Sequence, residues 1–530
     1  MKIMKPFIAL SCSLLLTLSA WGSANAKDDV STKSHASTSA KASIKDATNI
    51  NPGAITRAKP KNIAKSEDKL EIDDYIAMCK QDLQFVRSQM KKNSAAYANK
   101  IDKEFHRWFK EGNKNTLKLI SKIGDLDDCY YAIKYYINGF HNSHISIRGY
   151  IALPSEEYPG LLSAKKGKGH YIIYKHPALK YLKNVNIGDE LTHINGIKID
   201  RYYKDFLLPF YANDKSELTL ESASIYALIV DGNRFKPSPR RITLKQKQNK
   251  DINIDLKYTE LKGAAVEAAK KIKQPDRSAP FKVELVSNGV WIRIPSFFPA
   301  RNEAIYYTGM LSMLKNDLAK EDYILFDMRG NRGGASKWSR PIIRNLWGDA
   351  FIKSLGKKHD YNKKWQKNLR VSAENFPSFK KIYSPAASKS YASLIKRKKD
   401  FFLKKWSIYN DKENLYTNLD SKPFNAKIYV LTDHFCRSTC WKFVNELKQI
   451  PGVTHIGEET TIQSIYSYAK RERASSEHFD FFYPTQIRVK PSYKLGTALV
   501  PSEIYKGDFR DEASVIDWAL SITEKEDEDF

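Results

Sequence analysis

The spacing of apolar residues along the chain changes twice, and each change marks a different kind of structure. Residues 69–159 repeat apolar positions at helical intervals, which predicts a small helical N-terminal domain. Over residues 160–262, short runs of β-forming residues replace that spacing and predict a β module. In residues 263–530, short apolar strands alternate with helical segments, an order typical of an α/β core. The pattern therefore predicts an α/β protein, with an insertion at about 351–421 whose shape it leaves undefined.

A serine stands where one predicted strand gives way to a helix. The apolar run Ile428 to Leu431 predicts a buried strand, residues 432–437 have turn chemistry, and helical spacing begins at Thr439. Ser438 is therefore expected at a helix N-terminus, where free backbone N–H groups and the helix dipole favour developing negative charge. Nucleophilic serines are often found at such a junction.

A glycine-rich loop follows an earlier predicted strand. Gly330, Gly333 and Gly334 come after the apolar run Tyr323 to Phe326. Glycines let backbone N–H groups point at a ligand oxygen with no side chain in the way. Alone, such a loop is more often plain structure. Together, this loop and the serine turn could supply an oxyanion donor and a nucleophile, the two needs of acyl transfer.

Three stretches of the chain share their order with the motifs of a known family. They are Phe140 to Ile147, Phe326 to Gly334 and Val430 to Trp441. They resemble, in turn, a Leu-Gly-Asp-Gly-His-Thr segment, an Asp-Leu-Arg-Gly-Asn-x-Gly-Gly loop and a Thr-Ala-Ser-Ala-Ala-Glu elbow. These motifs belong to the serine peptidases that include the C-terminal-processing (tail-specific) peptidases and the tricorn core peptidase. The resemblance spans roughly residues 70–525 and implies a ClpP/crotonase-like α/β catalytic core in 263–530.

The β module carries a resemblance of its own. Asn186 to Gly196 is similar to the Gly-Asp-x-Ile…Ile-Asn-Gly signature of PDZ domains, which this peptidase family commonly inserts before its core. The resemblance implies a PDZ-like domain over residues 160–262. PDZ domains bind extended peptides by adding a strand to a sheet edge. The alternative is a degenerate β-subdomain that has no ligand.

The family resemblance also implies how the serine is activated. Its members use either a lysine shortly after the serine or a histidine from the N-terminal segment as the base. Gln463 stands where the lysine should be and cannot accept a proton, and Lys442, one helical turn after the serine, is expected to point elsewhere. Ser143-His144 aligns with the Ser-His pair of the tricorn-type subgroup. We therefore assign Ser438 as nucleophile, His144 as general base and Ser143 as an orienting group.

Other residues compete for or complete this site. His434 is a rival base, and His141 with His144 could form half of a metal site, although no third ligand has a supporting spacing. We expect no metal and no cofactor. The N–H groups of Gly333 and Thr439 are the expected oxyanion donors. The tricorn-type glutamate aligns near Leu495 and is absent, so Glu503 is the nearest substitute as orienting acid.

The N-terminus has the pattern of a secretory signal peptide. Lys2 and Lys5 precede an apolar run, and Ala24-Asn25-Ala26 forms a small-residue cleavage site, so residues 1–26 are expected to be removed. A retained membrane anchor is the alternative, although the apolar run is shorter than the roughly 20 residues that a span needs. Residues 27–68 are rich in Ser, Thr, Ala and Lys, which predicts a disordered linker.

The cysteines fit an exported protein. Cleavage of the signal removes Cys12 and leaves an even number of cysteines, which makes disulfides plausible. Four cysteines allow three sets of pairs, and we favour Cys79 with Cys129 and Cys436 with Cys440. The second pair would clamp the turn at the serine. The alternative for that pair is two small buried thiols.

The charge of the chain bears on its partners. The formal net charge of +28 falls to +26 when the two lysines of the signal leave, and such a charge suits adhesion to anionic envelope surfaces. Because the lysines are scattered along the chain, we expect no specific nucleic-acid binding. The sequence thus predicts a periplasmic or secreted serine endopeptidase that acts on envelope polypeptides. Two alternatives remain: a catalytically degenerate relative that binds peptide or protein, and a basic envelope or polyanion-binding protein.

Overall fold

The computed structural model describes residues 71–525, with gaps at 152, 274–279, 287, 317–319, 359–364, 407–425, 449, 451, 490–496, 508 and 510. The predicted signal peptide, residues 1–26, and the predicted linker, residues 27–68, lie outside the described residues. All described residues fall within one contact-defined unit, residues 68–530. None of the helices in the described ranges is long and apolar enough to cross a membrane.

Helices dominate the first described segment, as predicted. Their buried faces carry residues such as Val86, Phe109 and Ile133 at helical spacing. The side chains of Asp102 and Asp125 accept hydrogen bonds from backbone N–H groups in the first turns of the third and fourth helices. The helices are α1 (Ile72–Asn93), α2 (Ala95–Ala98), α3 (Lys103–Ile120) and α4 (Leu126–Asn138).

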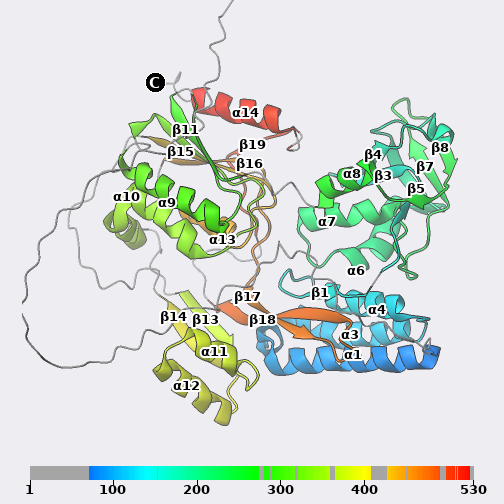
Figure 1. Cartoon of the computed structure of the whole chain (residues 1–530), viewed down its shortest axis with the longest axis horizontal. Coiled ribbons are helices and arrows are strands. Elements are labelled where there is room, and N and C mark those ends of the chain that lie inside the picture. Colours follow the sequence, from blue (N-terminus) through cyan, green and yellow to red (C-terminus); the bar gives the residue numbers. More distant parts are fainter. Residues whose placement is uncertain are drawn as a thin grey trace, which may run out of the picture. The chain divides into compact units, whose positions relative to one another are not determined.

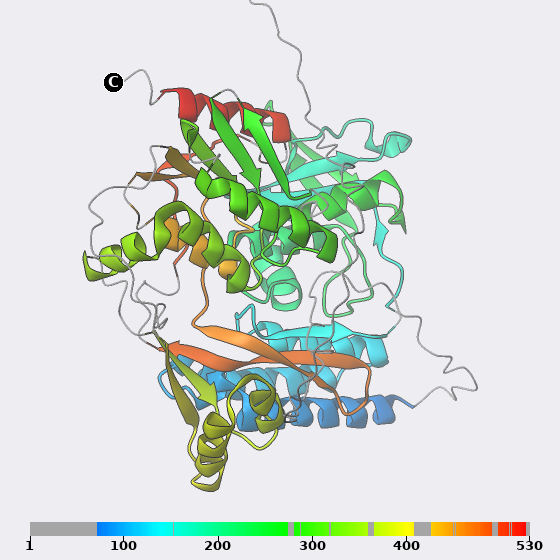
Figure 2. The same ribbon diagram turned by 60° about the vertical axis from the view of Figure 1, so that its left-hand side comes forward.

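A sheet built from distant parts of the chain packs on these helices. Its core residues Phe481, Tyr483 and Ile487 share one apolar cluster with the buried faces of α1 to α4, and the orange strands run beside the blue helices in Figure 2. The described part of the predicted insertion supplies two strands and two helices. The strands are β1 (Ser146–Gly149), β13 (Trp365–Arg370), β14 (Phe401–Trp406), β17 (Tyr466–Arg473) and β18 (Phe479–Val489), and the helices are α11 (Phe376–Ile382) and α12 (Pro385–Lys396).

The predicted β module contains a six-stranded antiparallel sheet with its own apolar core. Buried Ile242 and Leu244 alternate with more exposed residues along Arg241–Lys245. Short helices pack on this sheet. Its strands are β3 (Leu161–Lys166), β4 (Gly169–Lys175), β5 (Glu190–Ile194), β6 (Ile197–Lys198), β7 (Arg241–Lys245) and β8 (Asp251–Asp255), and nearby elements are β2 (Glu157–Tyr158), α5 (Ile199–Tyr202), α6 (Leu208–Tyr211), α7 (Glu217–Ser224), β9 (Thr259–Glu260) and α8 (Ala264–Lys273).

The α/β core is a six-stranded sheet with the order β10-β11-β12-β15-β16-β19. From β11 onward each strand pairs in parallel with the next, and the strands expected at Tyr323 to Phe326 and Ile428 to Leu431 are present. They are β10 (Lys282–Val286), β11 (Gly289–Arg293), β12 (Tyr323–Asp327), β15 (Lys427–Thr432), β16 (Val453–Gly457) and β19 (Glu503–Ile504).

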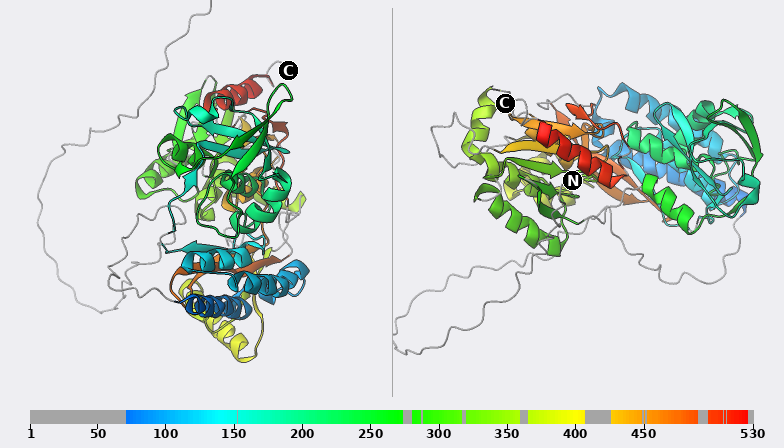
Figure 3. Two further views of the ribbon diagram at one scale, coloured as in Figure 1. Left: turned by 90° about the vertical axis from the view of Figure 1, so that its right-hand side faces the viewer. Right: turned by 90° about the horizontal axis from the view of Figure 1, so that it is seen from above.

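Helices cover both faces of the core sheet, which explains its continuous apolar strands. One face packs on α9 (Arg301–Asn316), α10 (Ser336–Lys358) and α13 (Thr439–Leu447) through a large apolar cluster. The opposite face packs on α14 (Glu512–Lys525), red in Figures 1 and 3. This layering places the start of α13 at the carboxyl end of β15, where open parallel sheets usually hold their ligands.

Candidate active site

Ser438 occupies a strained turn between β15 and α13. It is the residue immediately before α13, with φ 57° and ψ −113°. A positive φ is unfavourable for a residue other than glycine, and such strain of about 1–3 kcal/mol persists mainly where the surroundings enforce it at functional sites. A sharp strand-to-helix turn of this kind exposes a nucleophilic hydroxyl. The predicted position of Ser438 at a helix N-terminus is confirmed.

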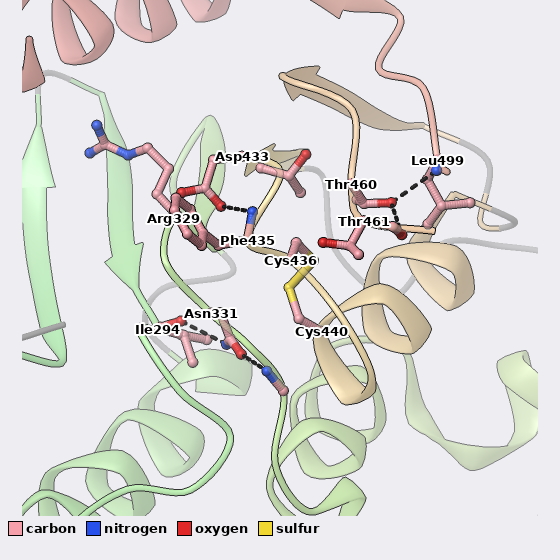
Figure 4. The surroundings of a disulfide bond; sticks show 12 residues. Ile294, Arg329, Asn331, Asp433, Phe435, Cys436, Cys440, Thr460, Thr461 and Leu499 are labelled. Carbon is pink, nitrogen blue, oxygen red and sulfur yellow. Dashed lines mark hydrogen bonds between the residues drawn. A yellow bond between two sulfur atoms is a disulfide. The ribbon is translucent and has the colours of Figure 1, made fainter. Parts of the chain in front are cut away.

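Two disulfides are present with the predicted pairing. Cys436 and Cys440 flank Ser438, with Cα atoms 5.2 Å apart, and Figure 4 shows the bond at the start of α13. Both of these cysteines are fully buried. Thr461 donates its backbone N–H to the Cys436 carbonyl at 3.1 Å, so a third segment also holds the turn. Cys79 and Cys129 link α1 to α4.

The two disulfides should differ in what they stabilise. In the chain-entropy description, a loop closed over a separation of 4 residues contributes about 2 kcal/mol, and one closed over 50 contributes about 4 kcal/mol. We therefore expect replacement of Cys436 and Cys440 by serine to lower the peptidase activity expected from the sequence motifs about tenfold, with a modest fall in Tm. The matched variant without Cys79 and Cys129 should show the larger fall in Tm and keep its activity at low temperature. The activity and the Tm of both variants are measured side by side. A larger loss of activity in the variant without Cys79 and Cys129, or a larger fall in Tm in the variant without Cys436 and Cys440, would contradict the prediction.

The glycine-rich loop touches the serine turn directly. A Cβ on Gly333 would lie 2.7 Å from the Arg437 carbonyl oxygen, 2.8 Å from the Thr439 nitrogen and 2.9 Å from the Ser438 Cβ. Only glycine fits, because these are backbone or near-backbone atoms and φ is 95°. Asn331 fixes the loop by donating from Nδ2 to the Ile294 carbonyl at 2.8 Å (Figure 4).

The geometry of the loop identifies which N–H groups are free. Gly333 donates its N–H to the Asn331 side-chain oxygen at 2.8 Å, so this group is already engaged. The N–H groups of Thr439 and Gly334 have no acceptor within the part of the chain that the structure describes. The Thr439 hydroxyl donates to the Gly334 carbonyl at 2.5 Å, which ties the two peptide segments together. Gly333, the glycine that the sequence analysis named as a donor, therefore has its N–H engaged by Asn331, whereas its neighbour Gly334 does not.

A buried carboxylate joins the loop to the turn. Asp433 accepts from the Gly330 N–H at 2.8 Å and from the Phe435 N–H at 3.0 Å, and the latter bond is drawn in Figure 4. Burial raises the pKa of Asp433 to about 6. Sequence reasoning missed this residue, although an acidic side chain directly after an apolar strand is a usable signal.

The structure places the rival base His434 in an ion pair. Its Nδ1 lies 2.7 Å from a carboxylate oxygen of Glu458. Burial opposes protonation of His434, but the Glu458 carboxylate outweighs burial and raises the pKa of the imidazole to about 9. His434 is therefore protonated at neutral pH and is a poor general base there.

His144 has the opposite electrostatic environment. Burial, together with the positive charges of Arg488 and Arg437, lowers the pKa of His144 to about 4. The imidazole is therefore neutral at pH 7 and able to accept a proton. The Nδ1 of His144 is buried without a hydrogen-bond partner in the described ranges, while its backbone N–H donates to the Asn142 side chain at 3.0 Å.

The remaining predicted site residues lie in different settings. Ser143 is half-buried beside His144, and Gln463 is buried. Lys442 forms an ion pair with Glu446 at 3.3 Å along α13. Glu503 is exposed in β19, where it pairs with Ile456 at the edge of the sheet. Among the described residues, no group of three His, Cys, Asp or Glu side chains could hold a metal ion.

Comparisons with known proteins agree with this geometry. Residues 290–474, which include the glycine loop and the serine turn, match the profile of peptidase family S41. The structure of mature CPAF complexed with lactacystin has a TM-score of 0.51 at 10% identity, covering 81% of this chain and 94% of that one. The crystal structure of mature CPAF has a TM-score of 0.51 at 10% sequence identity, and the match covers 81% of this chain and 93% of that one. At this identity the likeness shows the fold. No curated protein sequence matches the chain.

The family assignment thus has support from motif order, from the fold and from the profile match. The matched residues contain the strand, loop and turn around Ser438 that the sequence motifs had indicated. Residues 290–474, the part of the chain that holds this site, are thus similar to peptidase family S41.

Proposed function

We propose that this protein is an exported serine endopeptidase that hydrolyses peptide bonds in cell-envelope polypeptides by a Ser/His mechanism. The observation that carries the proposal is the conformation of Ser438, a strained positive-φ residue at the start of α13 that faces a glycine loop. Similarity to a serine peptidase family supports a polypeptide substrate.

Each step of acyl transfer has a candidate group. Ser438 Oγ attacks the scissile carbonyl carbon, and His144 takes the hydroxyl proton and returns it to the leaving amine. The N–H groups of Thr439 and Gly334, which have no acceptor in the described ranges, are our candidates for stabilising the negative charge on the former carbonyl oxygen. Water, deprotonated by His144, then hydrolyses the acyl-enzyme. The family resemblance supports His144 as the general base. It also supports Ser143, the preceding residue, as an orienting group.

The base assignment predicts a specific ranking of variants. We expect His144→Ala to lower kcat/KM for an unfolded polypeptide by about 10² or more, the usual weight of general-base catalysis. Gln463→Ala should matter far less, because an amide cannot accept the proton. His141→Ala, which removes a neighbouring histidine from the same loop, is the matched control and should stay within a few-fold of the wild type. Activity near wild type in a folded His144→Ala protein would contradict the mechanism.

A second candidate function is peptide or protein binding without cleavage. It is favoured by the unpartnered Nδ1 of His144 and by the exposed edge position of Glu503, the residue named as its orienting acid. In serine peptidases a third group normally holds the histidine in the productive tautomer. Binding of an unfolded polypeptide with no cleavage by the wild type would favour this candidate over the enzyme.

Export and a PDZ-like role for the β module complete the proposal. The signal-peptide pattern of residues 1–26 and the two disulfides suit an oxidising compartment such as the periplasm. The antiparallel sheet of residues 161–255 has edge strands of the kind that add an extended peptide. The net positive charge suits contact with an anionic envelope surface.

A further inference from the structure

Asp433, the residue directly after β15, bonds the glycine loop to the serine turn. Its side chain accepts from the Gly330 N–H in the loop at 2.8 Å and from the Phe435 N–H in the turn at 3.0 Å, the latter bond being drawn in Figure 4. Its backbone carbonyl accepts from the N–H of Cys436 at 3.0 Å, where the disulfide begins. One residue therefore shapes the start of the turn and also holds the loop that approaches Ser438.

The loop is sensitive to the loss of this contact. At its other end, the Gly334 carbonyl is held by the Thr439 hydroxyl at 2.5 Å. Without the bond from Gly330, the loop would therefore shift relative to the turn without being detached. A misplacement of about 1 Å at a catalytic site can lower a rate by about 10². Such a shift moves the N–H groups of Gly334 and Thr439 relative to Ser438.

The Asp433 carboxylate is buried among charged groups. Its residue is only 7% exposed, and burial raises its pKa from 3.8 to about 6. The charge of protonated His434 opposes this rise, and the charge of Glu458 adds to it. The Arg329 guanidinium, which Asp327 binds at 2.7 Å, also feels the charge of Asp433. Asp433 therefore changes its protonation state between pH 7 and pH 5.

Protonation changes what this side chain can accept. The ionised carboxylate offers one oxygen to the Gly330 N–H and one to the Phe435 N–H, whereas in a neutral carboxyl group one oxygen becomes an O–H donor. One of the two N–H bonds must then weaken. The pKa of His144 is about 4, so the proposed base stays mostly neutral between pH 7 and pH 5. An effect of Asp433 in this range is therefore separate from titration of the base.

We propose that Asp433 is a positioning residue whose carboxylate holds the glycine loop against the serine turn, and that its protonation releases the loop and lowers the activity of the peptidase. The effect on activity rests on the proposed function, whereas the effect on the loop does not. Asp433 acts here through the positions of the Gly334 and Thr439 N–H groups, without touching the substrate.

The pH dependence of kcat/KM for an unfolded polypeptide tests the effect on activity. With a pKa of about 6, about one tenth of Asp433 is ionised at pH 5, so the wild type should be about tenfold less active at pH 5 than at pH 7. Asp433→Asn keeps the shape of the side chain, but its amide nitrogen cannot accept a hydrogen bond. This variant should have the low value at pH 7 and lose less than about twofold more at pH 5, because His144 is still mostly neutral there.

Thermal unfolding separates this effect from acid denaturation. Because folding raises the pKa of Asp433, the folded chain binds this proton more tightly than the unfolded chain. The stability that the protonated group contributes is therefore full below about pH 3.8 and is lost as the pH rises to about 6. The Tm of the wild type relative to that of Asp433→Asn should thus be higher at pH 5 than at pH 7, although the activity of the wild type falls.

Two further variants test the assignment of the pH step. His434→Gln removes a positive charge that lowers the pKa of Asp433, so the midpoint of the step should move to higher pH. Asp82→Asn is the matched control. Asp82 is a buried carboxylate that accepts from the Ser476 N–H at 2.9 Å and from the Ser475 hydroxyl at 2.7 Å, and not from the loop or the turn. The Asp82 variant should keep the step of the wild type.

Amide hydrogen exchange measures the loop without any cleavage. In the full chain carrying Ser438→Ala, the protection of the Gly330 or the Phe435 amide, corrected for the intrinsic effect of pH on exchange, should be about fivefold lower at pH 5 than at pH 7, the weight of one net hydrogen bond. With Asp433→Asn added, the protection should be equal at the two pH values.

The outcomes separate this inference from the proposed function. Protection of both amides that is the same at pH 5 and pH 7, or a pH step in activity that survives Asp433→Asn, would overturn the positioning role. If the wild type cleaves no polypeptide at either pH while the protection still depends on Asp433 and on pH, the peptidase function is wrong and the hold of Asp433 on the loop remains.

Discussion

Ser438→Ala is expected to abolish proteolysis of an unfolded polypeptide, with kcat/KM at least about 10³-fold lower than that of the wild type. The Oγ of Ser438 is the atom that forms the acyl-enzyme in the proposed mechanism, and no other group in the turn can replace it. Alanine meets the same positive-φ strain as serine, so the free energy of unfolding should change little. Cleavage of a reduced, unfolded protein, followed by gel or mass spectrometry, measures the effect.

A second serine provides the control for this result. Ser502 is exposed and donates its hydroxyl to the His455 carbonyl at 2.9 Å, away from the catalytic turn. Ser502→Ala should keep its activity. If folded Ser438→Ala cleaves the polypeptide as fast as the wild type, the proposed nucleophile is wrong. If the wild type itself does not cleave but binds the polypeptide, the non-catalytic candidate is favoured.

Gly333→Ala is expected to lower kcat/KM by about 10²–10³, the loss typical of a disturbed oxyanion site. The added Cβ would lie 2.7 Å from the Arg437 carbonyl and 2.8 Å from the Thr439 nitrogen, so the serine turn must shift. A displacement of this kind moves both the nucleophile and the free N–H groups. Positive φ adds a conformational cost of about 1 kcal/mol or more, which should also lower the Tm.

Gly330→Ala separates the effect of contact from that of strain. Gly330 also has a positive φ, 74°, and it lies in the same loop, but a Cβ there would meet nothing within 4 Å. Its variant should therefore lose only the stability that the positive φ costs, while keeping most of its activity. Measurements of kcat/KM and Tm for both variants show whether the contact with the serine turn or the backbone strain lowers the activity. Equal activities in the two variants would show that the approach of Gly333 to the serine turn does not control catalysis.

Much of the candidate site could be predicted because it depends on neighbours in the chain. Ser438 stands between a continuous apolar strand and a helix with 3.6-residue periodicity, and both signals are local. Cys436 and Cys440 are four residues apart at a helix start, a spacing that brings their Cα atoms within disulfide range. The helical N-terminal segment and the parallel strands of the core followed from the same kind of periodicity.

Contacts between residues that are far apart in the sequence became known only from the tertiary structure. Insertion strand β13 and β1, which lies just after His144, both pair with β18, and no local pattern indicates these partners. The pairing of His434 with Glu458, the engagement of the Gly333 N–H by Asn331 and the exposed edge position of Glu503 likewise depend on folded neighbours.

The physical reason for this division is the range of the interactions. The apolar period of a helix or strand and the torsional demands of a turn act between adjacent residues, so the amino-acid sequence alone determined the strands, the serine turn and the glycine loop. The protonation of a histidine and the choice of an oxyanion donor depend on burial and on hydrogen-bond partners supplied by distant segments. Only the folded chain brings those partners together, and so only the tertiary structure shows that His434 pairs with Glu458, that burial keeps His144 neutral and that Asn331 engages the Gly333 N–H.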